Sequence, residues 1–238
     1  MNAVTLTALA LIITCGGFAS SEEPPSSARS REAIDRVRPE LERQLVKMGA
    51  RYGSPVFMRV FKEEAELEVW VDTGDHFVLF RTYEICAASG TLGPKQRRGD
   101  GQCPEGFYYV GSSGLNPRST FHLSFDIGYP NEYDRQLGRT GSAIMVHGDC
   151  VSIGCFAMTD VGIEEIYALA DAALRGGQPF FRVHVFPFRM TKRNMEAHRD
   201  SEWCGFWENL REGYDYFEAE GRPPDVRVAR GRYVFAAS

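Results

Sequence analysis

Short runs of β-branched and aromatic residues, broken by turn residues, constrain the fold of this chain more than any other feature. Three such runs follow Pro55 in close succession, and each has the length and composition typical of a strand. They span residues 56–61, 67–71 and 77–80. Acidic and glycine-containing segments separate them, which predicts tight turns and therefore a β-meander. Further strand-like runs cover residues 107–110, 121–127, 142–146 and 180–186.

Helical periodicity is confined to three parts of the chain. Apolar residues recur at spacings of three and four in the first, which predicts an N-terminal helix within residues 30–54. The clearest helix begins after an N-cap at Thr159 or Asp160 and stops at Gly176. A C-terminal helical extension is predicted over residues 191–238, with one or two helices within residues 191–219 and a short final strand within residues 226–235. Its aromatic side chains are expected to pack in the core. These are Trp203, Phe206, Trp207, Tyr214 and Phe217. The fold class that follows is mainly β with flanking helices, α+β.

The N-terminus predicts export from the cytoplasm. Residues 4–18 form the longest apolar stretch, and a Ser- and Pro-rich linker follows over residues 20–29. A small-x-small sequence ending at Ala19 predicts a signal peptide over residues 1–19. An uncleaved membrane anchor and lipid attachment at Cys15 remain alternatives. Thirty-two acidic residues against 27 basic ones give a net charge of −5, which argues against a nucleic-acid partner.

Removal of the signal peptide leaves an odd number of cysteines, so at least one thiol stays unpaired. They are Cys86, Cys103, Cys150, Cys155 and Cys204. A surface disulfide between Cys103 and Cys204 is one prediction, with two free thiols as the alternative. Cys150 is expected to be a small buried apolar residue. A Cys150–Cys155 disulfide is the less favoured pairing, and it would block Cys155. No two cysteines have zinc-site spacing, so no metal is predicted.

One segment combines the groups needed for nucleophilic catalysis. His147 ends a predicted strand, and Cys155 follows eight residues later, in a glycine-containing loop that leads into a helix. A nearby base or the positive end of a helix favours the thiolate form of a cysteine. Gly154 permits a left-handed backbone, so that the Gly154 and Cys155 N–H groups are candidates to bind an oxyanion. Ser152 is expected to orient the loop or His147.

This segment, VHGDCVSIGCFAMTD, resembles the catalytic signature of the L,D-transpeptidase (YkuD-domain) family, and specifically its YafK-type murein branch. The similarity extends over about residues 55 to 235. It includes the stretches RVFKEEAELEVWV, LGPKQRRGDGQCPEGFYYV and FDIGYPNEYDRQLGRTGSAIMVHG. The resemblance implies a YkuD-type catalytic domain with a mixed sheet or β-sandwich over residues 55–190.

The resemblance also implies an activity. It predicts an exported enzyme that acts on the stem peptides of peptidoglycan without a cofactor, as a monomer in the periplasm of a Gram-negative bacterium. Cys155 attacks the meso-diaminopimelate carbonyl, and His147 takes the thiol proton. An amine then resolves the acyl-enzyme in transpeptidation, or water does so in hydrolysis. Since the branch is associated with detaching wall-bound outer-membrane lipoprotein, hydrolysis is the first alternative. A non-catalytic wall-binding module is the second.

Two features depart from the common family pattern. His147 lies closer to the cysteine than is usual, and Ala157 occupies a position where Arg or Asn is common. Four further residues are predicted to contact the stem peptide, although turn residues look the same in a sequence. These are Tyr129, Asn131, Arg139 and Gly148. A polar loop with Lys95, Arg97, Arg98 and Asp100 is a second candidate for stem-peptide carboxylates. His122 and His184 fall in predicted strands and are expected to be structural.

Overall fold

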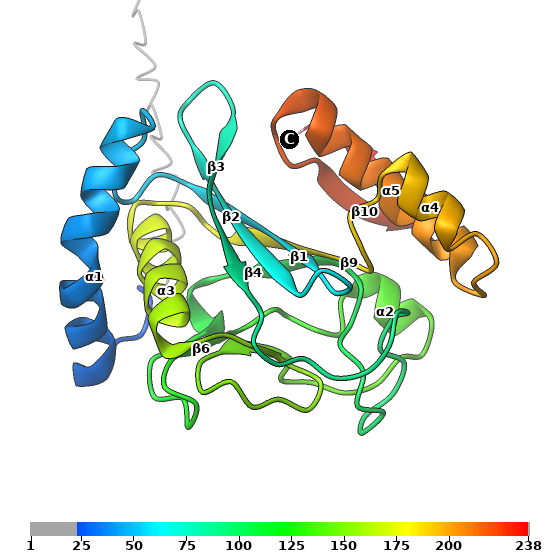
Figure 1. The fold of residues 1–238 in the computed structure, drawn as a ribbon, viewed down its shortest axis with the longest axis horizontal. Coiled ribbons are helices and arrows are strands. Elements are labelled where there is room, and N and C mark those ends of the chain that lie inside the picture. The colour runs from blue at the N-terminus through cyan, green and yellow to red at the C-terminus, as the bar shows by residue number, and fades with distance from the viewer. Residues whose placement is uncertain (1–22, 238) are drawn as a thin grey trace, which may run out of the picture.

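The computed structural model describes residues 23–237 (Figure 1). The predicted signal peptide, its cleavage after Ala19 and the alternative of lipid attachment at Cys15 lie outside the described residues. Within residues 23–237, no helix has both the length and the apolar composition needed to span a membrane.

The first sheet contains the predicted meander. Strands β1 (Val56–Phe61), β2 (Glu66–Asp72) and β3 (Phe77–Glu84) pair antiparallel in succession, which confirms that prediction. Strand β9 (Phe181–Phe186) then pairs parallel with β1, and β4 (Gly106–Val110) pairs antiparallel with β9. The resulting order is β3-β2-β1-β9-β4. A parallel pair needs a long crossover, and here the crossover includes the second sheet.

The second sheet is small and has the order β5-β6-β7-β8. Its strands are β5 (Leu115–Asn116), β6 (Ser124–Asp126), β7 (Met145–His147) and β8 (Phe156–Ala157). The strands predicted over residues 121–127 and 142–146 are shorter than expected. The reason is that His122 and Ala143 have φ values of 62° and 56°, left-handed conformations that interrupt a strand.

Two helices lie side by side against the core (Figure 1). Helix α3 (Asp160–Arg175) starts where predicted, because the Thr159 side chain accepts a hydrogen bond from the Gly162 N–H. Helix α1 (Ala28–Lys47) begins inside the predicted linker and ends before residue 54, where Gly49 turns the chain with φ 79°. Its residues Ala33, Leu41 and Leu45 are buried in the main core. The N-terminal helix therefore belongs to the same folding unit as the sheets.

The C-terminal segment contains two helices and a hairpin. Helices α4 (Lys192–Ala197) and α5 (Cys204–Glu220) precede strands β10 (Asp225–Ala229) and β11 (Arg232–Ala236). The predicted helical extension is therefore only partly helical. Its predicted packing is confirmed, because three aromatic side chains are buried and two are partly buried against the core. The buried ones are Trp207, Tyr214 and Phe217, and the partly buried ones are Trp203 and Phe206.

The first sheet is buried on both faces. In β1, Val56, Met58 and Val60 join the main core with α1, α3 and the second sheet. Phe57 and Phe61 point the other way, into clusters that include residues of α5. Two short elements, the 3-10 turn η1 (Ser112–Gly114) and helix α2 (Glu132–Gln136), complete the fold. The predicted class, mainly β with flanking helices, is confirmed.

Candidate active site

The register of the second sheet places Cys155 and His147 on one face. Phe125, Val146 and Phe156 are aligned across β6, β7 and β8, and all three are buried in the main core. Because successive residues of a strand point to opposite faces, the residues next to these three face away from the core. His147 follows Val146, and Cys155 precedes Phe156. The Met145 N–H donates to the Cys155 Sγ at 3.4 Å, which holds the thiol against the start of β7.

His147 is oriented by the backbone. Its ring lies 4.8 Å from the Phe121 ring, centroid to centroid, and only 2% of the residue is exposed. The Nδ1 atom lies 2.6 Å from the carbonyl oxygen of Gly148. A carbonyl oxygen can only accept, so Nδ1 carries the proton and Nε2 presents a lone pair. His147 is therefore held in the tautomer that a general base requires.

The surroundings of the Cys155 thiol do not favour its ionisation. Burial raises the pKa of the thiol above the ordinary value, and the negative charge of Asp126 raises it further. The hydrogen bond from the Met145 N–H and the positive charge of Lys95 lower the pKa, but by less. The prediction that a helix N-terminus favours the thiolate of Cys155 is wrong, because β8 follows Cys155 directly and α3 begins only at Asp160. Formation of the thiolate therefore depends on transfer of the proton to a base.

Two serines hold the loop that carries Cys155. The Ser152 Oγ accepts from the Cys155 N–H at 3.0 Å and donates to the Cys155 carbonyl at 2.8 Å. The Ser89 Oγ accepts from the Gly154 N–H at 2.7 Å. Gly154 has φ 86°, the left-handed conformation expected of it. Both predicted oxyanion donors are thus bound to hydroxyl groups, which a substrate oxygen has to displace. Ser152 orients the cysteine through these hydrogen bonds, and among the described residues it forms none with His147.

A disulfide also anchors the loop between β7 and β8. Cys86 and Cys150 are bonded, while Cys103, Cys155 and Cys204 are free. The alternative of two free thiols at Cys103 and Cys204 is therefore confirmed, and the disulfide between them is wrong. Cys103 is buried, with its Sγ 3.3 Å from the Cys155 carbonyl oxygen. The prediction that Cys150 is a buried apolar residue is also wrong, since Cys150 is exposed. The Cys86–Cys150 bond leaves the Cys155 thiol unblocked.

Comparison with known proteins identifies the family of this chain. Residues 57–185, more than half of the chain, match the YkuD family, described as the L,D-transpeptidase catalytic domain. A protein of Escherichia coli strain K12 named "Putative L,D-transpeptidase YafK" is 45% identical over 234 residues, which cover 98% of this chain and 90% of that one. The chain belongs to the L,D-transpeptidase family.

Solved structures resemble this L,D-transpeptidase domain more distantly. The helical cell shape determining protein Pgp2 from Campylobacter jejuni is 16% identical with a TM-score of 0.43, covering 79% of this chain and 80% of that one. Bd1075 from Bdellovibrio bacteriovorus is 25% identical with a TM-score of 0.40, covering 69% of this chain and 62% of that one.

Three of the residues predicted to contact substrate in this L,D-transpeptidase domain bind other protein groups instead. Tyr129 is 4% exposed, and its hydroxyl donates to the Lys95 carbonyl at 3.2 Å. Asn131 caps α2 and donates to the Phe107 carbonyl at 2.9 Å. Arg139 pairs with the fully buried Asp134 at 2.8 Å. These contacts give all three a structural role.

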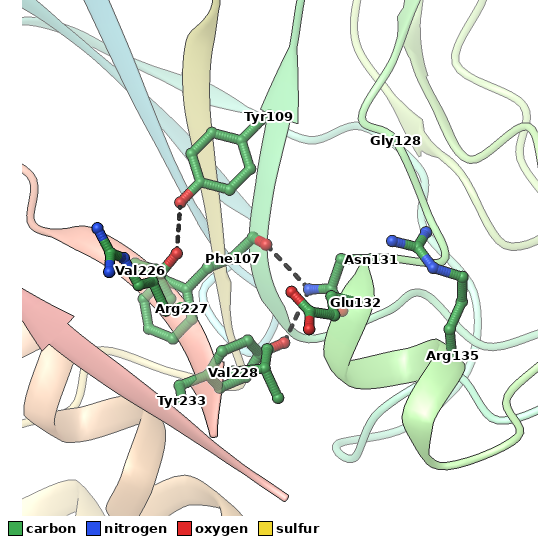
Figure 2. Close-up of a pocket in the computed structure, with 10 residues that line it drawn as sticks. All are labelled: Phe107, Tyr109, Gly128, Asn131, Glu132, Arg135, Val226, Arg227, Val228 and Tyr233. Carbon is green, nitrogen blue, oxygen red and sulfur yellow. Dashed lines mark hydrogen bonds between the residues drawn. The ribbon is translucent and has the colours of Figure 1, made fainter. Parts of the chain in front are cut away.

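Asn131 also lines a cavity of about 300 Å³ between β4, α2 and the C-terminal hairpin. Figure 2 shows the Asn131 amide reaching the Phe107 carbonyl, while Tyr109 donates to Val226 on the opposite wall. Cys155 and His147 are not among the residues that line this cavity. The cavity is therefore separate from the Cys155–His147 face.

Of the polar loop, Lys95 and Asp100 are bound within the protein, while Arg97 and Arg98 are exposed. Lys95 is 5% exposed and pairs with Asp100 at 2.6 Å. Burial works against ionisation of Asp100, but hydrogen bonds from the Arg97 N–H and the Lys95 ammonium keep its pKa far below the ordinary value. His122 is not in a strand, and its Nε2 lies 2.8 Å from Glu164. His184 is buried in β9.

Two polar residues on the face of Cys155 and His147 were not predicted from the sequence. Ser124 is aligned with His147, and Asp126 is aligned with Met145, which lies beside Cys155. Both share the face of His147, because they alternate with Phe125, which belongs to the core. The sequence contains this signal, since polar residues at 124 and 126 alternate with apolar ones at 123, 125 and 127. It could not reveal which strand lies beside them.

Proposed function

We propose that this protein acts on the stem peptides of peptidoglycan through a covalent acyl-enzyme, with Cys155 as the nucleophile and His147 as the general base. The observation that carries the proposal is the placement of a free thiol and a correctly oriented imidazole on one face of the second sheet. The membership of the L,D-transpeptidase family supports it. No cofactor enters the proposed reaction.

The proposed reaction has two steps. The thiol proton moves to Nε2 of His147 as Sγ attacks the carbonyl of the diamino acid at the third stem position. The tetrahedral intermediate collapses, His147 gives the proton to the departing amine, and a thioester remains on Cys155. In the second step an amine or a water molecule loses a proton to His147 and attacks the thioester, which releases the thiol.

Transfer and hydrolysis share the first step and differ only in the second. An amine acceptor gives a transpeptidase, which is our preferred assignment. Water gives an amidase, which would detach a lipoprotein bound to the wall. A binding module without catalysis is disfavoured, because such a module has no need of a free Cys155 thiol or of an imidazole oriented through Nδ1 as a base.

Incubation of purified sacculi with the protein tests the proposal. We expect wild type to change the muropeptides seen by mass spectrometry, Cys155→Ala to leave them unchanged, and Cys204→Ser to act as wild type. New links between two diaminopimelate residues indicate a transpeptidase. Released lipoprotein or shortened stems indicate a hydrolase. Identical products from wild type and Cys155→Ala overturn the catalytic assignment and favour the binding module.

We also propose that the protein works as a monomer in the periplasm of a Gram-negative bacterium. The apolar segment before Ala19 supports export. A disulfide between Cys86 and Cys150 fits an oxidising compartment. The described chain supplies both Cys155 and His147, so the site needs no second copy. Fractionation of cells and mass analysis of the mature N-terminus test the location and the fate of Cys15.

A further inference from the structure

Asp126 and the nucleophile lie on either side of strand β7, on the face proposed for catalysis. Strand β6 pairs Asp126 with Met145 and Ser124 with His147. Since Phe125 between them is buried in the main core, both polar side chains point to the face of Cys155 and His147. The face that carries the thiol and the imidazole thus also carries a carboxylate and a hydroxyl from β6.

Both groups have unused hydrogen-bonding capacity. The Asp126 Oδ1 accepts from the Gly128 N–H at 2.9 Å. No Lys, Arg or His nitrogen of residues 23–237 lies within 4.0 Å of this carboxylate. Ser124 is 1% exposed, and its Oγ has no hydrogen-bond partner in the described part of the chain. Buried polar groups are almost always paired, so the hydroxyl of Ser124 is free to accept or donate a further hydrogen bond, to a water molecule or another group.

An unpaired carboxylate here works against the free enzyme. Its negative charge raises the pKa of the Cys155 thiol and so opposes formation of the thiolate. Lys95 opposes this effect, but its Nζ already binds Asp100 and the Arg97 carbonyl. A carboxylate in this position becomes useful once a cation arrives with the substrate, because the cation cancels the charge when the thiol has to ionise.

We propose that Asp126 binds a primary ammonium group of the substrate, namely the free side-chain ammonium of the diamino acid whose carbonyl Cys155 attacks. This assignment rests on the proposed function and adds a specificity determinant to it. Binding is by a charge-assisted hydrogen bond and involves no covalent step. Stem peptides with that amine free are the preferred acyl donors, and peptides with the amine blocked are poor ones.

Acyl-enzyme formation measures this preference without an acceptor. The full chain is mixed with disaccharide tetrapeptides whose diaminopimelate amine is free or acetylated, and intact-protein mass spectrometry gives kcat/KM for the first step. For wild type, we expect acetylation to lower kcat/KM by about tenfold or more. Asp126→Asn lowers it with the free amine and reacts at equal rates with the free and the acetylated peptide, because the interaction that distinguishes them is removed.

Alkylation of Cys155 provides a second measurement with the opposite sign. Without substrate, Asp126→Asn removes a negative charge that raises the pKa of the Cys155 thiol, so we expect iodoacetamide to modify Cys155 several-fold faster at pH 8 than in wild type. The asparagine keeps an oxygen for the Gly128 N–H. Asp200→Asn is the matched control, since its side chain is 96% exposed, and it leaves both measurements unchanged.

The outcomes separate this inference from the proposed function. If wild type forms no acyl-enzyme with either peptide, the proposed function fails and the inference fails with it. If wild type acylates equally with both peptides, or Asp126→Asn loses the same factor on both, only the inference is overturned. If Asp126→Asn changes only the amine-dependent second step, the bound ammonium belongs to the acceptor and the assignment to the donor is wrong.

Discussion

At the scale of single residues, the backbone of Gly148 determines how His147 is presented. The Gly148 carbonyl accepts the Nδ1 proton and leaves Nε2 free. The residue also sits in a tight space, because a Cβ at this position would lie 2.5 Å from the Asp160 Oδ1 and 3.1 Å from the Ile163 Cγ2. A glycine is needed here because of this close approach. The structure gives Gly148 a positioning role, and its contact with substrate stays a prediction.

Gly148→Ala is expected to slow acyl-enzyme formation by about 100-fold, because the backbone has to shift and the imidazole moves with it. Intact-protein mass spectrometry of the first step gives the rate, and thermal unfolding shows whether the variant folds. Gly205→Ala is the control, since a Cβ there meets no atom within 4 Å. A wild-type rate in a folded Gly148→Ala protein would show that the carbonyl does not position His147.

At the scale of elements, the loop between β7 and β8 is fixed at several points along its length. Cys150 is bonded to Cys86, the Gly154 N–H donates to Ser89, and Ser152 binds Cys155. The Cys86 N–H in turn donates to the Ala157 carbonyl of β8 at 2.9 Å. The segment from Cys86 to Ser89 therefore lies along the loop and holds it through these bonds. A loop held in this way presents its nucleophile in one position.

Replacing both Cys86 and Cys150 by serine is expected to lower the free energy of unfolding by about 2–4 kcal/mol, because the disulfide closes a long loop of the unfolded chain. We expect kcat/KM of acylation to fall by about tenfold as the loop loosens. Urea denaturation and the acylation assay measure the two effects. Cys204→Ser controls for the loss of a sulfur atom. Unchanged activity in the double variant would show that hydrogen bonds alone fix the loop.

At the scale of the whole molecule, the first sheet lies between two apolar layers. Strand β9 sends Val183 and Val185 into the main core and His184 toward the layer that includes α5. The His184 ring lies 4.6 Å from the Phe57 ring and 4.7 Å from the Phe107 ring, centroid to centroid. Neither nitrogen of the His184 ring has a hydrogen-bond partner among the described residues. Burial, with the positive charges of Arg182 and Arg59, holds the pKa of His184 well below the ordinary value.

The protein is therefore expected to lose stability in mild acid. The unfolded chain protonates His184 near its ordinary pKa and the folded chain does not, so the unfolded state binds more protons as the pH falls below about 6.5. The free energy of unfolding should drop by up to about 1.4 kcal/mol per pH unit from this group. Urea denaturation from pH 7.5 to 5 measures it.

His184→Leu should flatten this pH dependence, since it removes the titrating group and retains an apolar side chain. His76→Gln is the control, because His76 is exposed and its loss should leave the slope unchanged. An equal slope in wild type and His184→Leu would mean that other groups cause the acid sensitivity.

Local patterns in the sequence determined most of the elements. The meander, the Thr159 cap and the strand over residues 180–186 were predictable because periodicity and capping depend on neighbours within one element. The same holds for Cys155 and His147 as candidates, since their segment is contiguous and resembles a family signature. The left-handed Gly154 was predicted for the same reason.

Only the tertiary structure decided how distant segments meet. No local pattern relates the parts of the chain that meet in the parallel pairing of β1 with β9, in the bond between Cys86 and Cys150, and in the hydrogen bond of Tyr129 to the Lys95 carbonyl. The position of Asp126 on the face of the thiol depends on the register of β6 with β7. Register and pairing follow from burying apolar surface across the whole core, which is a property of the packed molecule and not of any single segment.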